Sequence, residues 1–347
     1  MAEAHIAQPD VTTNEEVREP GKTATGASES VVDGARVRVS WMRFQPRDES
    51  GSGEPLAHET AIFLLPGWGY TEAATPTMAV GQAFADASGS VVYAIDTYTE
   101  RTAAYVAQRE AQAAKAFIDT IPAPRRILVG QSQGGWAAMY IAAQMPDVIG
   151  LVLVNSMGLE TRRLGSFMLS YVKENVDSSI LADYPAHSRS ATAELQAANW
   201  RYIREGLTEI GRQVHLAGGV LPYLERLSAE VKGMIVQNPC AGELTMPIVI
   251  VNGARDQLSR PDSIIPMQRP DHRGSPYLPS VKEREAYLRD HLFSKSPYIR
   301  MIVARKMGYH GLVAYRPLEV ARAALYLLAR ADRVRAANQR ASAAEQG

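Results

Sequence analysis

Short apolar runs alternate with helical patterns along most of the chain. The clearest apolar runs cover residues 61–65, 90–96, 127–129, 149–155, 248–251 and 301–304. Helical periodicity separates several of them, notably over 74–88 and 102–119. Short continuous apolar runs are typical of strands buried on both faces, and strands that alternate with helices form parallel sheets. The pattern therefore predicts an α/β fold with a doubly wound, mostly parallel sheet.

The start of the chain differs from this pattern. Residues 1–30 are polar, rich in Ala, Ser, Thr and Gly, and without periodicity, which predicts a disordered leader. Residues 36–41 alternate between polar and apolar positions, which predicts an edge strand with one solvated face. The folded core is therefore expected to begin near residue 31.

The alternation of strands and helices also stops in the middle of the chain. Residues 157–240 contain helical stretches and no predicted strand, so they are expected to form a helical insertion between two parts of one core, 31–156 and 241–331. A closing amphipathic helix is expected to begin at Pro317, with an apolar face at Leu318, Ala321, Leu325 and Leu328. Residues 332–347 are polar and are expected to form a flexible tail.

Composition narrows the class of protein. The 347 residues are 46% hydrophobic, which is enough to bury one large α/β core and an insertion. The 37 basic and 37 acidic residues balance, so no charge pattern indicates binding to nucleic acid or to a membrane surface. No signal peptide and no membrane span is predicted. The only cysteine, Cys240, excludes an internal disulfide and is interpreted as a buried or interfacial thiol, so a cytoplasmic location is expected.

The strand predicted over residues 127–129 ends in residues that can carry chemistry. It leads directly into Gly130-Gln131-Ser132-Gln133-Gly134, and an Ala-rich helical segment follows. A serine at a sharp strand-to-helix turn needs small residues two positions away on either side, because strand and helix approach closely there. Such a turn exposes the serine hydroxyl and places the next backbone N–H at a helix N-terminus, where negative charge is stabilised. The alternative is a glycine-rich turn with an ordinary capping serine.

Three other predicted strands end in complementary groups. Residues 61–65 lead into the loop Pro66-Gly67-Trp68-Gly69, residues 248–251 are followed by Asp256, and residues 301–304 precede a loop that contains His310. Loops at the carboxyl ends of the strands surround the site in open α/β folds. The four motifs are therefore expected to meet at one edge of the sheet.

These motifs, in this order, resemble the α/β-hydrolase superfamily over about residues 36–331. The resemblance implies an α/β-hydrolase fold in which residues 157–240 form a lid. It also implies that Ser132 is the nucleophile, His310 the base and Asp256 the acid that orients the imidazole. The backbone N–H groups of Trp68 and Gln133 would form the oxyanion hole.

Two features of the motifs bear on these assignments. Many relatives have histidine at the position of Pro66; because the expected donor is a backbone N–H beyond Gly67, the proline leaves the hole intact in principle. Asp96 also follows an apolar run and is a rival for the acid, since some members of the fold place the carboxylate on a different strand. Asp256 is preferred because its strand–Gly-x-x-Asp context matches the usual placement.

Two segments are candidates for substrate contact. The insertion carries large apolar side chains, some of which are expected to line a substrate pocket, with Phe167, Tyr171 and Trp200 as candidates, although packing of the lid on the core is the favoured explanation for any single one. Residues 265–280 form a proline-rich loop, which is interpreted either as a substrate contact or as a surface excursion.

The implied activity is hydrolysis of a carboxylic ester or related acyl bond in a small-molecule substrate through an acyl-enzyme. Carbon–carbon bond hydrolysis, thioester hydrolysis, acyl transfer and perhydrolysis use the same residues and stay open. A non-catalytic, ligand-binding α/β-hydrolase fold is the less favoured alternative. No residues with metal-ligand spacing and no nucleotide-binding motif occur, so neither a metal nor another cofactor is expected. Assembly into a homo-oligomer is left open.

Overall fold

A computed structural model describes most of the predicted core. The described residues are 24–32, 34–47, 60–67, 75–99, 107–159, 238–254, 256, 280–304 and 316–346, together with positions 208, 211, 214, 215, 218–222 and 225 within the insertion.

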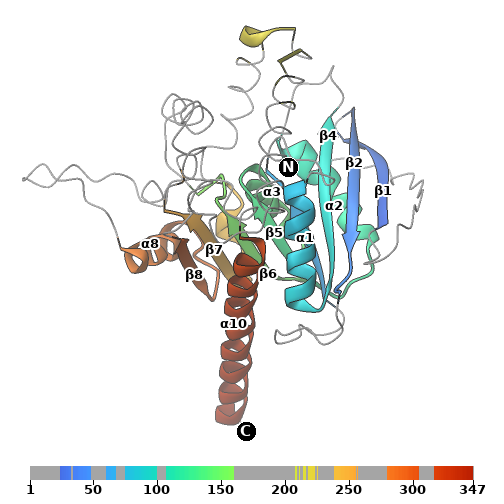
Figure 1. The fold of residues 1–347 in the computed structure, drawn as a ribbon. Coiled ribbons are helices and arrows are strands. Elements are labelled where there is room, and N and C mark those ends of the chain that lie inside the picture. The colour runs from blue at the N-terminus through green and yellow to red at the C-terminus, as the bar shows by residue number, and fades with distance from the viewer. Residues whose placement is uncertain are drawn as a thin grey trace, which may run out of the picture.

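Eight strands form a single sheet in the order β1-β2-β4-β3-β5-β6-β7-β8 (Figure 1). The strands are β1 (Ala24–Val32), β2 (Ala35–Phe44), β3 (Thr60–Leu65), β4 (Val91–Thr99), β5 (Arg125–Gln131), β6 (Val148–Val154), β7 (Ile248–Gly253) and β8 (Ile299–Ala304). Neighbouring strands from β4 to β8 pair in parallel, whereas β2 pairs antiparallel with both β1 and β4. The predicted mostly parallel sheet is confirmed.

Helices cover both faces of this sheet. Helices α1 (Thr75–Ser88) and α10 (Pro317–Gln346) pack with one face, which is turned toward the viewer in Figure 1. Helices α2 (Ala107–Thr120), α3 (Gln133–Ala142) and α8 (Val281–Tyr287) lie on the other face, and a π-helical turn, Leu288–Leu292, continues α8. A short 3-10 helix, Ala241–Glu243, precedes β7.

The central strands are apolar at every position because both of their faces are buried. Phe63, Leu128 and Leu153 point into the core beneath α2, α3 and α8. Their neighbours in sequence, such as Val129 and Val152, point into the core beneath α1 and α10. Successive side chains of a strand alternate between the two faces, so burial on both sides produces the continuous apolar runs of the sequence.

The first strand lies partly inside the segment predicted to be a disordered leader. Strand β1 begins at Ala24 and pairs along its whole length with β2. Its buried positions include Ser28 and Ser30, so the alternation of buried and exposed residues is not an alternation of apolar and polar ones. Gly26 lies against the Trp41 ring, where a Cβ would overlap the indole. Pairing with β2 therefore forms a strand that hydrophobic periodicity does not reveal. Residues 1–23 of the predicted leader lie outside the described residues.

The prediction of an edge strand over residues 36–41 was wrong for a related reason. Strand β2 pairs with β1 on one side and β4 on the other, so β1 is the edge. The solvated face was predicted correctly, since Arg36 and Arg38 are exposed while Val37 and Val39 are buried. The hydrophobic pattern of a strand depends on which of its faces are buried. An edge strand and an inner strand that each have one solvated face therefore show the same pattern.

The closing helix is longer than predicted. Helix α10 continues beyond Asp332 to Gln346 and projects past the sheet at the bottom of Figure 1. Residues 332–346 contain neither glycine nor proline and are rich in alanine, so nothing in them ends a helix. The boundary at residue 332 is therefore not an end of the helix, and the flexibility of residues 332–347 stays a prediction. Leu318, in the first helical turn, is 38% exposed, and the buried face consists of Val320, Ala321, Ala324, Leu325, Leu328 and Ala331.

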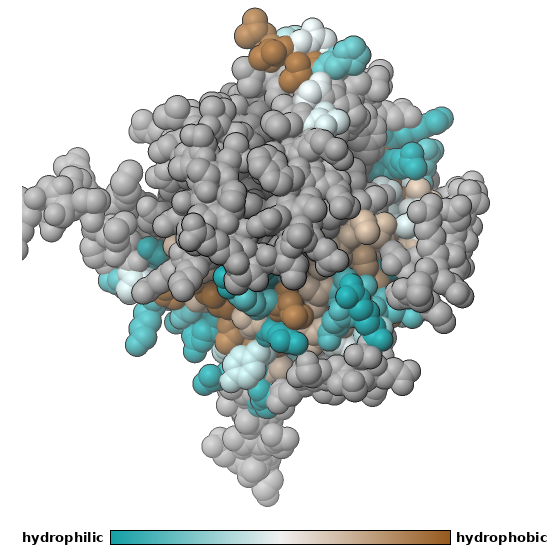
Figure 2. Space-filling view, viewed as in Figure 1, coloured by the Kyte–Doolittle hydropathy of each residue, from teal (hydrophilic) through white to brown (hydrophobic). Residues whose placement is uncertain are grey.

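Most of the predicted lid, residues 157–240, lies outside the described residues. Described positions 208, 211, 214, 215, 220–222 and 225 are helical. Val220 and Leu221 are exposed there, and Figure 2 shows brown, apolar atoms at the corresponding top end of the molecule. Residues 265–279 also lie outside the described part. Of the helices that the structure describes, none is both long and apolar enough to cross a membrane.

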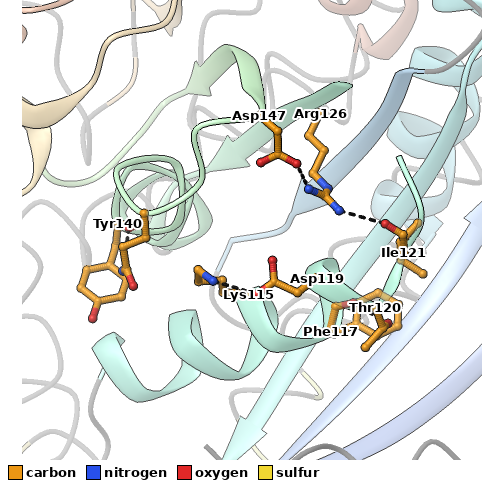
Figure 3. A network of polar contacts seen from close by, with 9 residues as sticks. Lys115, Phe117, Asp119, Thr120, Ile121, Arg126, Tyr140 and Asp147 are labelled. Atoms are coloured by element: carbon orange, nitrogen blue, oxygen red, sulfur yellow. Dashed lines mark hydrogen bonds and ion pairs between the residues drawn. The ribbon is translucent and has the colours of Figure 1, made fainter. Parts of the chain in front are cut away.

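A polar network stabilises the amino-terminal ends of strands β5 and β6 (Figure 3). The Arg126 guanidinium forms an ion pair with Asp147 and donates a hydrogen bond to the Ile121 carbonyl oxygen at 2.9 Å. The Arg126 backbone N–H also donates to the Asp147 carbonyl oxygen at 3.1 Å. One side chain thus joins the turn before β5 to the turn before β6, where the register of the two strands shifts.

Replacing Arg126 by Met is expected to lower the free energy of unfolding by about 1–3 kcal/mol, because it leaves the partly buried Asp147 carboxylate without its partner. Lys115 supplies a matched control, since its ion pair with Asp119 joins neighbouring turns of α2. Lys115→Met is expected to cost at most about 0.5 kcal/mol. Urea unfolding measures both losses. Equal losses would show that the Arg126 pair stabilises no more than a surface pair.

Candidate active site

Ser132 occupies a sharp turn between β5 and α3. Strand β5 ends at Gln131 and α3 begins at Gln133, so the turn consists of one residue. The Ser132 backbone has φ 52° and ψ −120°, a conformation that side-chain-bearing residues adopt at a cost of about 1–3 kcal/mol. The side chain is 8% exposed. Such strain persists only where the surrounding structure imposes it, which is common at functional sites.

Three glycines make this turn sterically feasible. A Cβ on Gly130 would overlap the backbone of Gly134 and Gly135, where strand and helix meet. A Cβ on Gly134 would overlap the backbone carbonyl groups of Leu65 and Pro66. A Cβ on Gly135 would overlap the Ser156 hydroxyl. The need for small residues around the serine, inferred from the sequence, is confirmed at each of these positions.

Backbone hydrogen bonds fix the Ser132 main chain on both sides. Its N–H donates to the Val154 carbonyl oxygen at 3.0 Å. Its carbonyl oxygen accepts from the N–H of Gly135 at 3.0 Å and from that of Met157 at 2.9 Å. The segment at the end of β6 therefore forms hydrogen bonds with both peptide groups of Ser132.

The turn lies where the chain reverses the direction in which it adds strands to the sheet. Strands β3 and β5 are neighbours, with β4 beyond β3 and β6 to β8 beyond β5. The helices that follow them, α1 and α3, cover opposite faces. A crevice opens at such a switch point, outside the carboxyl ends of the strands, and ligands bind there in open α/β sheets. Ser132 is at this point.

The loop after β3 directly contacts the Ser132 turn. A Cβ on Gly67 would be 3.1 Å from the Ser132 Cβ and 3.8 Å from its Oγ, so the main chain passes closely over the serine. The next residue, Trp68, lies outside the described residues. Gln133, the other expected oxyanion donor, is the first residue of α3, where the helix dipole stabilises negative charge. Pro66 does not disturb this approach.

Asp256 follows β7 at the same edge of the sheet as Ser132. Its side chain is 2% exposed, and its N–H donates to the Gly253 carbonyl oxygen at 3.2 Å. The preceding Ala254 N–H donates to the Ala304 carbonyl oxygen at 2.8 Å, so the turn is joined to the end of β8. Strand β7 is separated from β5 by β6 alone.

Asp96, the rival acid, is placed differently. It lies within β4, paired in register with Ser40 of β2, and it is partly exposed. Asp96 is two residues after Ala94, so its side chain lies on the same face of the sheet, the one covered by α1 and α10. Thr97 lies on the opposite face, where its hydroxyl donates a hydrogen bond to Glu110 of α2 at 3.3 Å. A carboxylate in a loop beyond a strand end reaches over the sheet edge more readily than one inside the ladder, which favours Asp256.

The remaining predicted site residues cannot be placed in this way. His310, Phe167, Tyr171 and Trp200 lie outside the described residues, so their roles stay predictions. The residues that the structure does bring together are Ser132, Gln133 and Gly67, with Asp256 at the same edge.

Sequence reasoning missed Asn155, which ends the predicted strand 149–155. It is fully buried and has φ 44°, the only other non-glycine residue besides Ser132 with positive φ among those described. Its Oδ1 accepts a hydrogen bond from the Gly253 N–H at 2.8 Å. A polar residue at the end of an apolar run, with a known tolerance for left-handed backbone, was the available signal.

Cys240, interpreted from the sequence as a buried or interfacial thiol, is partly buried. Partial burial raises the pKa of the Cys240 thiol, and the nearby Glu243 carboxylate raises it further. A raised pKa keeps the thiol protonated and less nucleophilic at neutral pH. Within the described ranges, no group of three or more His, Cys, Asp or Glu side chains is arranged to hold a metal ion.

No known family model and no curated protein sequence matches the chain. Solved structures do match it. A membrane phospholipase A, described as a bacterial virulence factor, superposes with a TM-score of 0.55 at 17% identity over 89% of this chain and 87% of that one. A probable hydrolytic enzyme from Pseudomonas aeruginosa PAO1 gives 0.53 at 16% identity over 90% and 95%. The enol-lactonase from Burkholderia xenovorans LB400 gives 0.52 at 13% identity over 87% and 99%. The sheet order, the sharp turn at Ser132 and these likenesses agree, and the chain therefore has the fold of the α/β-hydrolase superfamily.

Proposed function

We propose that the protein is a serine hydrolase that cleaves a carboxylic ester or a related acyl bond in a small molecule. The observation that carries the proposal is the strained backbone of Ser132 at the switch point of the sheet, framed by glycines that leave no room for a Cβ. A merely structural turn does not require a serine in this conformation. A nucleophile does, because the turn lifts the hydroxyl above the strand ends.

The proposed mechanism assigns one role to each predicted site residue. The Ser132 Oγ attacks the acyl carbon while His310 accepts its proton, and Asp256 fixes the imidazole tautomer and stabilises its charged form. The N–H groups of Gln133 and Trp68 bind the oxyanion, and each such donor typically contributes about 3 kcal/mol to stabilising the transition state. His310 then returns the proton to the leaving group, and water releases the acyl group from Ser132.

The structural neighbours support the fold, and their names agree with this class of reaction. They are called a phospholipase, a hydrolytic enzyme and an enol-lactonase. Because one fold hosts many functions, we infer hydrolysis from the Ser132 turn and not from the names of the neighbours. Phe167, Tyr171 and Trp200 of the predicted lid remain the proposed pocket residues.

A fluorophosphonate probe tests the proposal, since it reacts covalently with an activated serine. We expect one equivalent of label on the native full-length protein and none on the heat-denatured protein. Trypsin leaves Ser132 and Ser156 on one peptide, residues 127–162, so fragmentation must assign the site between them. Hydrolysis of nitrophenyl esters of increasing acyl length measures the activity. Label on Ser156, or no label with no ester hydrolysis, would contradict the proposal.

A further inference from the structure

We infer that Asn155 is a positioning residue that holds the Asp256 turn in register with the Ser132 turn. The inference rests on the proposed function, because it gives Asp256 the role of the acid. Asn155 itself is placed at the end of β6, between the strand that carries the nucleophile and the strand that precedes the acid.

Asn155 replaces a missing backbone hydrogen bond between β6 and β7. Its N–H donates to the Val251 carbonyl oxygen at 2.8 Å, which continues the parallel ladder by one step. In a parallel ladder, the carbonyl oxygen of the same residue would next accept from the Gly253 N–H. Here the Asn155 side-chain oxygen accepts from Gly253 instead, at 2.8 Å. The side chain therefore maintains the contact with β7 after the main chain has turned away.

The main chain that turns at Asn155 contacts Ser132, the proposed nucleophile. Because φ of Asn155 is 44°, the chain leaves the sheet and brings Met157 N–H to the Ser132 carbonyl oxygen at 2.9 Å. The residue before Asn155, Val154, accepts from the Ser132 N–H. The backbone conformation of Asn155 thus joins β6 to the Ser132 turn.

The side chain of Asn155 is linked through Gly253 to Asp256, the proposed acid. Gly253, which donates to the Asn155 side chain, accepts in turn from the Asp256 N–H at 3.2 Å. Asn155 is fully buried and Asp256 is 2% exposed, so water does not readily replace a lost acceptor. Loss of the Asn155 amide therefore frees the Gly253 end of the turn. A displacement of about 1 Å at a catalytic group can cost roughly 100-fold in rate.

These two roles explain why the residue is an asparagine. The position requires both a left-handed backbone and a short side-chain acceptor. Glycine provides only the backbone conformation, whereas aspartate tolerates it and also retains an oxygen at the same place. The pair Asn155→Gly and Asn155→Asp therefore separates the backbone role from the role of the acceptor.

The test compares fluorophosphonate labelling rates and ester hydrolysis in these variants of the full chain. We expect Asn155→Gly to lower kcat and the labelling rate by about 10-fold to 100-fold with little change in KM, since it displaces the acid without touching a substrate pocket. Asn155→Asp is expected to react at least several-fold faster than Asn155→Gly. In the Asp256→Asn background, Asn155→Gly is expected to lower the rate little further, because both changes remove the same function.

Ser296→Ala is the matched control for loss of a buried side-chain hydrogen bond to the backbone. The Ser296 hydroxyl donates to the Met246 carbonyl oxygen at 2.8 Å, at the opposite end of β7. This variant is expected to lose stability and to keep the parental labelling rate. A stability effect alone would make Asn155→Gly behave in the same way.

Amide hydrogen exchange gives a readout that does not depend on catalysis. The N–H groups of Gly253 and Asp256 are expected to exchange faster in Asn155→Gly and at the parental rate in Ser296→Ala. Unchanged exchange at Gly253, or a parental labelling rate in Asn155→Gly, would overturn the inference while Ser132 remained the labelled residue. Failure of the parent protein to label would instead overturn the proposed function, and the positioning role with it.

Discussion

Replacing Ser132 by Ala is expected to abolish fluorophosphonate labelling and to lower kcat for ester hydrolysis by about 10⁶-fold, the order of loss when a serine nucleophile is removed. Alanine has no group that can attack the acyl carbon or form the covalent adduct. It also adds no volume at a position that is 8% exposed and closely approached by Gly67, so the fold is expected to persist. Probe labelling, ester hydrolysis and circular dichroism measure these outcomes.

The matched control for this substitution is Ser156→Ala. Ser156 is also buried beside the nucleophile turn and belongs to the same tryptic peptide, but its hydroxyl donates to the Met157 carbonyl oxygen at 2.7 Å. The Ser156 variant is expected to remain labelled. Persistent labelling in Ser132→Ala together with its loss in Ser156→Ala would move the nucleophile to Ser156.

The second large effect is expected from a substitution of Asp256, the proposed acid. Asp256→Asn should preserve the fold and lower kcat by about 10⁴-fold, because an amide holds the imidazole in the wrong tautomer; this magnitude is that of the equivalent change in a serine protease. The substitution keeps the shape of a side chain that is 2% exposed. Rates at saturating ester concentration measure the loss.

Asp96→Asn provides the comparison, because Asp96 is the other carboxylate that the sequence offered for this role. It lies inside the β4 ladder and faces the α1 and α10 side of the sheet, so the change is expected to cost far less activity. The opposite ranking of the two variants, with unchanged circular dichroism, would assign the acid to Asp96. Ser132 would keep its role in either case.

Several parts of the fold were predictable because their signals are local. The runs 61–65 and 248–251 are buried on both faces, and burial of both faces makes a strand continuously apolar. The sharp turn at Ser132 was predictable because its constraint is steric and falls on neighbours in sequence, Gly130 and Gly134. The order of Ser132 and Asp256 along the chain also followed from the sequence.

Other parts depended on partners that are distant in sequence. Strand β1 was not recognised because its buried positions carry serine, and its strand conformation comes from pairing with β2. Strand β2 was misplaced at the edge because a one-dimensional pattern records which face is wet and does not record how many neighbours a strand has. The extension of α10 is not indicated by hydrophobic periodicity, because residues 332–346 are mostly polar, although they retain a helix-forming composition.

Periodicity and steric exclusion act between residues close along the chain, so the sequence predicted the strands that are buried on both faces, the glycines around Ser132 and the residue types available for catalysis. The tertiary structure establishes which strands are neighbours. It placed the Gly67 loop over Ser132 at the switch point, and it set Asp256 beyond β7 while leaving Asp96 within a ladder. The tertiary structure also places Asn155 between Ser132 and Asp256, since the hydrogen bond from the Gly253 N–H to the Asn155 side chain spans 98 positions in sequence. Such contacts are created by the pairing of strands, which no local pattern encodes.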